Sequence, residues 1–480
     1  MLIDLVSSKS DCRREMMAAF IQSYSVLYVS NVLDSFVVVI CFFLVVIPVA
    51  GGSGVNTATH LSALVKDLSI INENNETMDV TLQTAINQND HYGRMLVNHA
   101  KDHAFELMNC SKNKNDDIEK GNASTGHCIV IVGEGDRSFV THLGVIGDFK
   151  ASDTILHELV NCRSADPTFQ NHHHHIHIAG YYNMPGFSKG NLKRRLKLVR
   201  EKRRCQSHGL NTYTTTTSLV PQYDATEEWD GGLLDDVLPL VDFLILNSLE
   251  AGKISKINIT EKDCGGALNR AVLFAQLADF FWEKSPLTHV ILTLGKMGAV
   301  AFYQGEVIAS MHSPKRYANP VDPTGAGDAF AAGFLFGVMN WRKEQGHENC
   351  AEIGSYLEGS WTKAIIDGMR YGCATGSACV ARVGASVPAS KDELEGLLNN
   401  PVDENERVCE EEESNSIIGI DDDDNSDNDD DNEDDDNDHS NIDSEYESEY
   451  DSEYDEMSVY SSSTASGESF LEDKEDDDEK

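Results

Sequence analysis

The sequence lacks the features that define several classes of protein. None of its eleven cysteines forms a Cys-x-x-Cys pair, and their spacing is irregular. An odd, unpatterned set of this kind is typical of reduced thiols inside the cell and argues against a disulfide framework. We therefore expect a cytoplasmic protein, with the nucleus as the alternative, whose cysteines are mostly core residues.

Positive charge is also scarce. The chain has 38 Lys and Arg residues against 80 Asp and Glu residues, which gives a net charge of −42. Nucleic-acid binding needs clustered cations, so nucleic acid is not a favoured partner of the chain as a whole. Most of the acidic excess lies in residues 401–480, which carry −33 and leave −9 for residues 1–400. This segment has too few apolar side chains to offset chain entropy, and we predict a disordered acidic C-terminal tail.

A long apolar run is missing as well. Residues 36–50 form an uncharged apolar stretch of fifteen residues that contains Pro48, and Arg13 and Arg14 precede it. A helix that spans a bilayer needs roughly 20 apolar residues. For residues 1–50 we therefore favour an atypical first strand of the fold, and a signal anchor in a membrane is the alternative.

Between these two ends, β-branched runs alternate with amphipathic helical stretches. The predicted strands include residues 128–132, 243–246, 289–294 and 299–303, and the clearest helices are residues 261–283 and 325–341. Such alternation predicts one α/β domain over residues 51–400, with a mostly parallel sheet that helices cover on both faces. Sheets of this kind bind ligands at the carboxyl ends of their strands.

One loop carries the strongest chemical signal. Residues 322–328 read Asp-Pro-Thr-Gly-Ala-Gly-Asp and lead directly into an apolar helix. The small residues Gly325, Ala326 and Gly327 allow their N–H groups to converge as an anion hole, and the start of the helix adds positive potential. Such a site suits the charge that develops on a phosphoryl group during transfer. Asp328 can then accept the proton of an attacking hydroxyl group as the catalytic base.

This loop resembles the second signature of the ribokinase-like (PfkB) carbohydrate and nucleoside kinases. Residues 51–58 resemble the first signature of that family, in which two glycines and an asparagine contact the hydroxyl groups of the substrate. The glycines of this segment, Gly51, Gly52 and Gly54, permit a polar ligand to approach the backbone closely. Asn56 offers both a donor and an acceptor to such a ligand.

Two later segments resemble the nucleotide-binding motifs of the same family. Asn247 and Glu250 match its Asn-x-x-Glu motif at the end of a predicted strand, where an amide and a carboxylate order Mg²⁺ through water. The alternative is that this pair only caps the next helix. Thr293, Gly295 and Gly298 match the family's Thr-x-Gly-x-x-Gly loop, whose hydroxyl group and small residues contact ATP.

The resemblance implies a ribokinase-like three-layer sandwich that binds ATP and Mg²⁺. It extends the ATP contacts, which include Asn247, to Gly327 and Cys373, where the family often has asparagine in place of the cysteine. Asp322 and Thr324 would border a site for K⁺. Asp34 would grip substrate hydroxyl groups, and the short interval between it and the first glycine pair implies a reduced or atypical β lid.

The function that follows is the ATP-dependent phosphorylation of a hydroxyl group of a sugar or sugar-like molecule. A nucleoside kinase of the adenosine type and a catalytically weak regulatory protein that retains the fold are the alternatives. A homodimer is an alternative to a monomer. Residues 193–204 are strongly basic and predict a solvated outer helix, to which the acidic tail could bind in place of another basic partner. The histidines at 172–175 are expected to precede a strand rather than to bind a metal.

Overall fold

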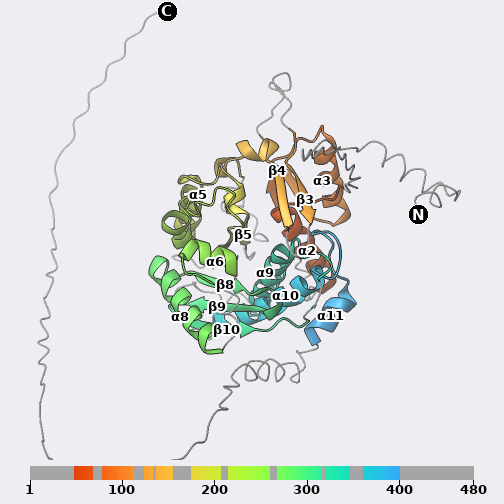
Figure 1. The fold of residues 1–480 in the computed structure, drawn as a ribbon. Coiled ribbons are helices and arrows are strands. Elements are labelled where there is room, and N and C mark those ends of the chain that lie inside the picture. Colours follow the sequence, from red (N-terminus) through yellow and green to blue (C-terminus); the bar gives the residue numbers. More distant parts are fainter. Residues whose placement is uncertain are drawn as a thin grey trace, which may run out of the picture. The chain divides into compact units, whose positions relative to one another are not determined.

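The computed structural model describes most of the chain between its two ends. The described residues are 48–68, 78–111, 124–132, 137–154, 174–206, 215–259, 267–315, 317, 320–345 and 360–399. The predicted acidic tail, Asp34 and most of the apolar stretch at residues 36–50 lie outside these ranges. Figure 1 shows that the described part is a mixed α/β fold, as predicted.

A six-stranded sheet forms the centre of the described fold. Its strands are β5 (His174–Ala179), β6 (Thr215–Val220), β7 (Phe243–Asn247), β8 (His289–Thr293), β9 (Ala299–Tyr303) and β10 (Glu306–Met311). They lie in the order β10-β9-β8-β7-β6-β5. The strands from β5 to β8 are parallel, whereas β9 and β10 run antiparallel to their neighbours. The prediction of a mostly parallel central sheet is therefore confirmed.

Helices cover both faces of this sheet (Figure 1). One layer consists of α5 (Asn191–Gln206), α6 (Ser248–Ser255) and α8 (Ala267–Lys284), and the other contains α2 (Ser53–Leu68), α9 (Ala326–Gln345), α10 (Ser360–Cys379) and α11 (Lys391–Asn399). Side chains of a strand alternate between the faces, so β7 buries Leu244 and Leu246 against the first layer and Phe243 and Ile245 against α9 and α10. Complete burial of each such side chain stabilises the fold by about 2 kcal/mol. The three-layer arrangement is confirmed.

Two small sheets precede the central one in the chain. β1 (Thr81–Thr84) pairs in parallel with β2 (Glu106–Asn109), and α3 (His91–Asp102) connects them. β3 (His127–Val132) and β4 (Arg137–His142) form a separate antiparallel sheet with exposed apolar side chains such as Ile129 and Val140. The strand predicted at residues 128–132 is thus confirmed, but it belongs to this small sheet rather than to the central one.

Short turns of helix connect the larger elements. They are η1 (Gly144–Asp148), η2 (Ala151–Asp153), η4 (Tyr181–Asn183), η5 (Leu233–Val237), η6 (Leu238–Leu240) and η7 (Gly295–Met297). Two of them, η4 and η7, directly follow the strands β5 and β8 and so lie at the edge where parallel strands end. This edge is where ligands of such sheets are expected.

The predicted basic helix is part of α5, and the fold itself uses some of its charges. Arg195 donates hydrogen bonds to the carbonyl oxygens of residues 151, 152 and 154, and Lys193 forms an ion pair with Asp236. No helix in the described ranges is long and apolar enough to cross a membrane.

The histidine cluster differs from its prediction. His174 and His175 lie inside β5 rather than before a strand. The neighbouring strand β6 explains this, because its hydroxyl groups supply partners: the ring of His175 hydrogen-bonds to Thr216 and to Ser218, at 2.7 Å each. Within the described residues, no group of His, Cys, Asp and Glu has an arrangement that could hold a metal ion.

Candidate active site

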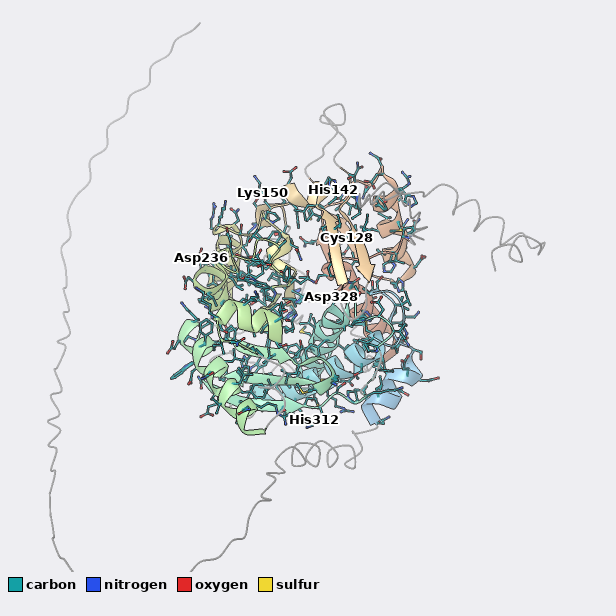
Figure 2. All side chains as sticks on the ribbon, in the orientation of Figure 1. Cys128, His142, Lys150, Asp236, His312 and Asp328 are labelled. Atoms are coloured by element: carbon teal, nitrogen blue, oxygen red, sulfur yellow. The ribbon has the colours of Figure 1, made fainter. Side chains whose placement is uncertain are left out.

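Asp328 lies in the first turn of α9, near the middle of the view in Figure 2. The residue is only 7% exposed. Its Oδ1 accepts hydrogen bonds from Ser53 Oγ at 2.6 Å and from Gln222 Nε2 at 3.2 Å. Its Oδ2 accepts one from Asn56 Nδ2 at 2.7 Å. Because an ionised carboxylate can only accept hydrogen bonds, these three donors suit the charged form of Asp328.

Two helices that are far apart in the sequence bring these groups together. α2 begins at Ser53, directly after Gly52, whose φ of +100° lies in the region that favours glycine. Since residues three apart share one face of a helix, the first turn of α2 presents Ser53 and Asn56 toward α9 together. Thr57 Oγ1 also donates to the carbonyl oxygen of Asp328 at 3.4 Å. The start of α2 therefore holds both the side chain and the backbone of Asp328.

The surroundings of Asp328 change its acidity. Burial raises the pKa of this carboxyl group above its ordinary value, whereas the hydrogen bonds from Asn56, Ser53 and Gln222 lower it. Burial prevails because removal from water disfavours the charged form. A carboxyl group with a raised pKa accepts a proton more readily than an exposed aspartate does, as a general base must.

Asn56 has one polar atom that stays unsatisfied. The residue is 4% exposed, and its Oδ1 has no hydrogen-bond partner, although its Nδ2 is bound to Asp328. Buried acceptors without a donor are uncommon in folded proteins and disfavour the fold by about 1–3 kcal/mol. The atom lies next to the carboxylate and needs a donor, which a ligand hydroxyl group can supply.

The carboxyl ends of β7 and β8 bring the predicted nucleotide residues together. Asn247, the last residue of β7, is the register partner of Thr293, the last residue of β8. Asn247 Oδ1 accepts the N–H of Glu250 at 2.9 Å, and Glu250 Oε2 accepts the N–H of Asn247 at 3.0 Å. The pair therefore caps α6, as the capping alternative expects of these residue types, and its role toward a metal stays a prediction.

Glu250 is a second buried carboxyl group near Asp328. Burial raises its pKa to about 7; the backbone hydrogen bond of Asn247 opposes this rise, and repulsion from Asp328 adds to it. A bound divalent cation would favour the ionised forms of both carboxyl groups. Carboxylate and amide oxygens are also the ligands that Mg²⁺ prefers, so this donor set fits that ion.

The glycine loop before α9 has the geometry of an anion site. Gly325 has a φ of +80°, and a Cβ atom there would lie 2.5 Å from the Cβ atom of Ala385, so no other residue fits. α9 begins at Ala326, whose N–H reaches the carbonyl oxygen of Pro323 at 3.4 Å. A Cβ atom at Gly327 would meet no atom within 4 Å. Open space therefore lies beside the first turn of this helix, whose N–H groups and positive potential favour an anion.

The two glycines of the predicted nucleotide loop have different surroundings. Gly298 has a φ of +109°, and a Cβ atom there would lie 2.0 Å from the carbonyl oxygen of Met311, so the turn into β9 requires this glycine. Gly295 has a φ of +57° and faces open space. Of the two, Gly295 is the one whose missing side chain leaves room for a ligand.

Two residues predicted at the site are part of the packing. Cys373 is 5% exposed and belongs to the core between the sheet and α10, where burial raises the pKa of its thiol to about 12. The side chain of Cys373 thus faces the core, and a contact of this residue with ATP stays a prediction. A Cβ atom at Gly54 would lie 3.0 Å from Leu82 Cδ1, so this glycine allows α2 to approach β1.

Asp322, predicted beside a cation, makes hydrogen bonds within the loop. Its Oδ1 accepts the N–H of Thr324 at 2.9 Å, and its Oδ2 accepts the N–H of Gly384 at 3.1 Å. These bonds connect the glycine loop to the segment after α10. The K⁺ site at Asp322 and Thr324 stays a prediction.

Two residues that bind Asp328 were missed by sequence reasoning. Ser53 stands among the glycines of the first motif, and its place at the start of a helix was the available signal. Gln222 follows β6 by two residues, and its position beyond the end of a parallel strand was the available signal. Neither position identifies its partner, because Asp328 is more than 100 residues away from both.

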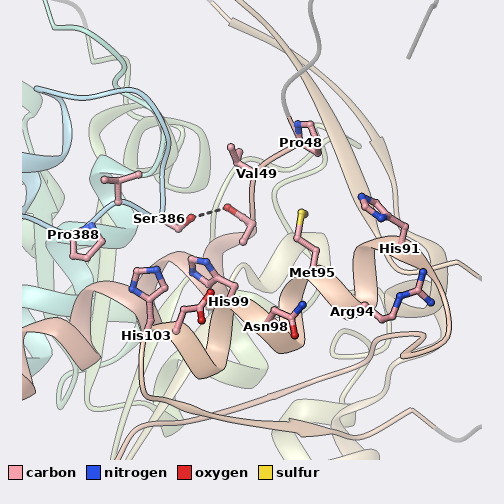
Figure 3. Close-up of a pocket in the computed structure, with 13 residues that line it drawn as sticks. Pro48, Val49, His91, Arg94, Met95, Asn98, His99, His103, Ser386 and Pro388 are labelled. Atoms are coloured by element: carbon pink, nitrogen blue, oxygen red, sulfur yellow. Dashed lines mark hydrogen bonds between the residues drawn. The ribbon is translucent and has the colours of Figure 1, made fainter. Parts of the chain in front are cut away.

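A cavity of about 670 Å³ lies beside α3, apart from these residues. Figure 3 shows α3 on one side of it and residues 48–50 and 386–388 on the other. Ser386 Oγ donates to the carbonyl oxygen of Ala50 at 2.6 Å and so joins the latter two segments. Neither Asp328 nor the strand-end residues line this cavity. The candidate active site is therefore defined by the hydrogen bonds around Asp328.

Comparison with known proteins identifies the family of this chain. No curated protein sequence matches it. The structure of ribokinase from Giardia lamblia is similar, with a TM-score of 0.51 and 18% sequence identity over 73% of this chain and 88% of that one. 2-Dehydro-3-deoxygluconokinase from Thermotoga maritima gives a TM-score of 0.48, with 18% identity over 73% of this chain and 89% of that one. Adenosine kinase from Sinorhizobium meliloti gives a TM-score of 0.44, with 16% identity over 80% of this chain and 86% of that one.

At such identities the similarity to the Giardia ribokinase demonstrates a shared fold alone. A family model described as pfkB family carbohydrate kinase matches residues 48–392. This match covers well over half of the chain and includes the glycine pair, the strand-end motif and the loop before α9. The protein therefore belongs to the pfkB family of carbohydrate kinases.

Proposed function

We propose that this protein transfers the γ-phosphoryl group of ATP to a hydroxyl group of a sugar or sugar-like molecule. The observation that carries the proposal is the buried carboxylate of Asp328 at an open helix start, where three side chains donate to it. Membership of a family of carbohydrate kinases supports the reaction type. A carboxylate in this position suits the removal of a proton from an alcohol during phosphoryl transfer.

In the proposed step, the acceptor oxygen attacks the γ-phosphorus atom of ATP. The bond between this phosphorus atom and the leaving oxygen of ADP breaks. Asp328 accepts the proton of the acceptor hydroxyl group. The N–H groups of Gly325, Ala326 and Gly327 stabilise the negative charge on the oxygens of the transferring group. The open space in front of Gly327 supports this role, because a phosphoryl group needs close access to the helix start.

The start of α2 is proposed to bind the acceptor. Asn56 Oδ1, which is buried and has no partner, would accept a hydrogen bond from a second hydroxyl group of the sugar. Gly51 and Gly52 would allow the sugar to approach the backbone, and a Cβ atom at Gly52 would meet no atom within 4 Å. Asp34 is proposed as a further contact with the acceptor.

The nucleotide is proposed to lie along the ends of β7 and β8, against Thr293, Gly295 and Gly298. Mg²⁺ would supply positive charge to the phosphates, and Asn247 and Glu250 would hold its water ligands. The raised pKa of Glu250 supports this arrangement, since a nearby cation would favour its ionised form. We extend the proposal to a K⁺ ion beside the loop before α9.

We also propose that residues 51–400 form the kinase domain. The family match over residues 48–392 has nearly these bounds and supports the proposal. Residues 1–50 and 401–480 would then be an atypical N-terminal segment and an acidic tail.

The test is the release of ADP by the purified protein with Mg-ATP and a panel of acceptors. The panel contains ribose, fructose, 2-dehydro-3-deoxygluconate and adenosine, and we expect a sugar to give the highest turnover. The isosteric variant Asp328→Asn should lower kcat by about 10²–10⁴-fold, the range typical of a lost general base. Asp235→Asn is the matched control, because that side chain is 82% exposed, and its turnover should equal that of the wild type.

Each of the other outcomes identifies a different function. Turnover only with adenosine would favour the nucleoside kinase. Binding of ATP without turnover of any acceptor would favour a regulatory protein that retains the fold. Undiminished turnover in Asp328→Asn would show that another group acts as the base.

A further inference from the structure

We propose that Gln222 is a positioning residue for Asp328, which selects the carboxylate oxygen that accepts the proton. The inference rests on the proposed function, in which Asp328 is the base. Gln222 lies just beyond the end of β6, and its Nε2 donates to Asp328 Oδ1 at 3.2 Å. It belongs to none of the motifs that predicted the site.

The amide of Gln222 is held in one orientation by a second amide. Asn183 Nδ2 donates to Gln222 Oε1 at 2.8 Å. Since this bond occupies the carbonyl side of Gln222, the amino side faces Asp328. Asn183 is the last residue of η4, which follows β5. The ends of β5 and β6 thus form a relay of hydrogen bonds that leads to the carboxylate at the start of α9.

The backbone around Gln222 is shaped for this amide. Gln222 has a φ of +61°, a left-handed conformation that a glutamine seldom adopts. Gly180, at the end of β5, has a φ of +76°, and a Cβ atom there would lie 2.9 Å from Gln222 Oε1. One position is strained and the neighbouring one is limited to glycine so that the amide fits. Strain of this kind persists only where the surrounding structure holds the residue in place, as the hydrogen bonds to Asn183 and Asp328 do here.

The pattern of donors shows what the amide achieves. Each carboxylate oxygen can accept about two hydrogen bonds. Within the described site, Oδ1 of Asp328 accepts hydrogen bonds from Ser53 and Gln222. Oδ2 accepts one hydrogen bond, from Asn56. Oδ1 is therefore saturated, and the proton of the acceptor goes to Oδ2. This oxygen is the one beside Asn56, whose own Oδ1 is the proposed contact for a sugar hydroxyl group.

The variant Gln222→Gly tests this role and keeps the fold. It removes the amide, and it also removes the strain, because glycine adopts the left-handed conformation readily. With Mg-ATP and ribose or fructose, kcat/KM should fall about tenfold while the KM for ATP stays unchanged. The amide lowers the pKa of Asp328, so its loss raises that pKa. The acid limb of the pH profile of kcat/KM should therefore move to higher pH, and further still in Gln222→Glu, which places a second negative charge beside Asp328.

Gln304→Gly is the matched control. Gln304 is also a glutamine in the left-handed region, with a φ of +51°, and it lies in the turn between β9 and β10. This turn is at the opposite end of β9 from the nucleotide loop. Both glycine variants should have a Tm no lower than that of the wild type, but Gln304→Gly should keep the activity and the pH profile of the wild type.

The outcomes separate this inference from the proposed function. If Asp328→Asn is inactive but Gln222→Gly keeps the kcat/KM and the acid limb of the wild type, only the role of Gln222 is overturned. If Gln222→Gly loses activity together with Tm and without a move of the acid limb, Gln222 is a structural residue. If Asp328→Asn stays active, or if the wild type releases no ADP with any acceptor of the panel, the proposed function fails and this inference fails with it.

Discussion

Replacing Glu250 by glutamine should stabilise the protein at alkaline pH while it slows phosphoryl transfer. Glu250 is 6% exposed, and burial raises its pKa to about 7 from an ordinary value of 4.5. A carboxyl group with a raised pKa in the folded state contributes its full stability below the unfolded pKa of 4.5, and this stability is lost as the pH rises through 7. Glutamine has nearly the same shape but never ionises, and its oxygen can still accept the N–H of Asn247.

The size of the effect follows from the two pKa values of Glu250. They differ by about 2.5 pH units, and a difference of one pH unit corresponds to about 1.36 kcal/mol. Ionisation of Glu250 therefore lowers the free energy of unfolding by about 3 kcal/mol at pH 8 and by under about 1 kcal/mol at pH 4.5. Glu250→Gln should recover this difference. About 3 kcal/mol is a large part of the 5–15 kcal/mol by which a typical domain is stable.

The assay is urea unfolding of both proteins at pH 4.5 and pH 8, with EDTA and then with excess Mg²⁺. In EDTA the variant should be more stable than the wild type at pH 8 and nearly equal to it at pH 4.5. Mg²⁺ should narrow the gap at pH 8, because a cation favours the ionised form of Glu250. The kcat of the variant should be at least about tenfold lower. Glu306→Gln, at an exposed position of β10, is the control that should change neither property.

Two results would refute this reasoning. Equal free energies of unfolding at pH 8 would show that Glu250 is solvated when it ionises. A variant with full kcat at the same Mg²⁺ concentration would show that the carboxylate has no part in holding the ion. The second result would leave Asn247 and Glu250 as a helix cap alone.

Two further predictions concern buried groups. His289 is 4% exposed and stacks on Tyr303, and burial lowers its pKa to about 4; stability is therefore lost as the pH falls below 6.5 toward 4. We compare the free energies of unfolding of His289→Phe and the wild type in urea. Their difference should shift by about 2 kcal/mol in favour of the variant between pH 7 and pH 5. A difference that is the same at both pH values would contradict a buried neutral ring. Gly325→Ala forces a left-handed alanine against Ala385 and should lower the free energy of unfolding by about 3 kcal/mol, whereas the control Gly327→Ala, in open space at a helix start, should not lower it.

The parts of the site that were predictable are those in which the chemistry lies in one short segment. The loop at residues 322–328 contains both its glycines and Asp328, so its conformation could be predicted and a role proposed from one segment. The side-by-side position of Asn247 and Thr293 depends on two parallel strands of the sheet, whose ends meet at one edge. Both strands carry short apolar runs that indicate buried strands from the sequence.

The sequence was less informative where the surroundings of a residue depend on partners far away in the chain. Cys373 lies in a segment with the right motif, but the direction of its side chain is set by how α10 packs against the sheet. His175 belongs to a strand because β6 supplies the hydroxyl groups that its ring requires. Gln222 has only its position beyond the end of β6 as a local signal, because its contacts with Asn183 and Asp328 exist only in the folded chain.

Several features that disfavour stability meet around Asp328. Asp328 and Glu250 are buried carboxyl groups with raised pKa values, Asn56 has a buried acceptor without a partner, and Gln222 has a strained backbone. A protein selected for stability alone would lose nothing by having glutamine at 250 and glycine at 222. In sequences that fold well, local propensity, core packing, polar contacts and charges all favour the same structure, except where function requires otherwise. The proposed function offers a reason for each of these four conflicts around Asp328.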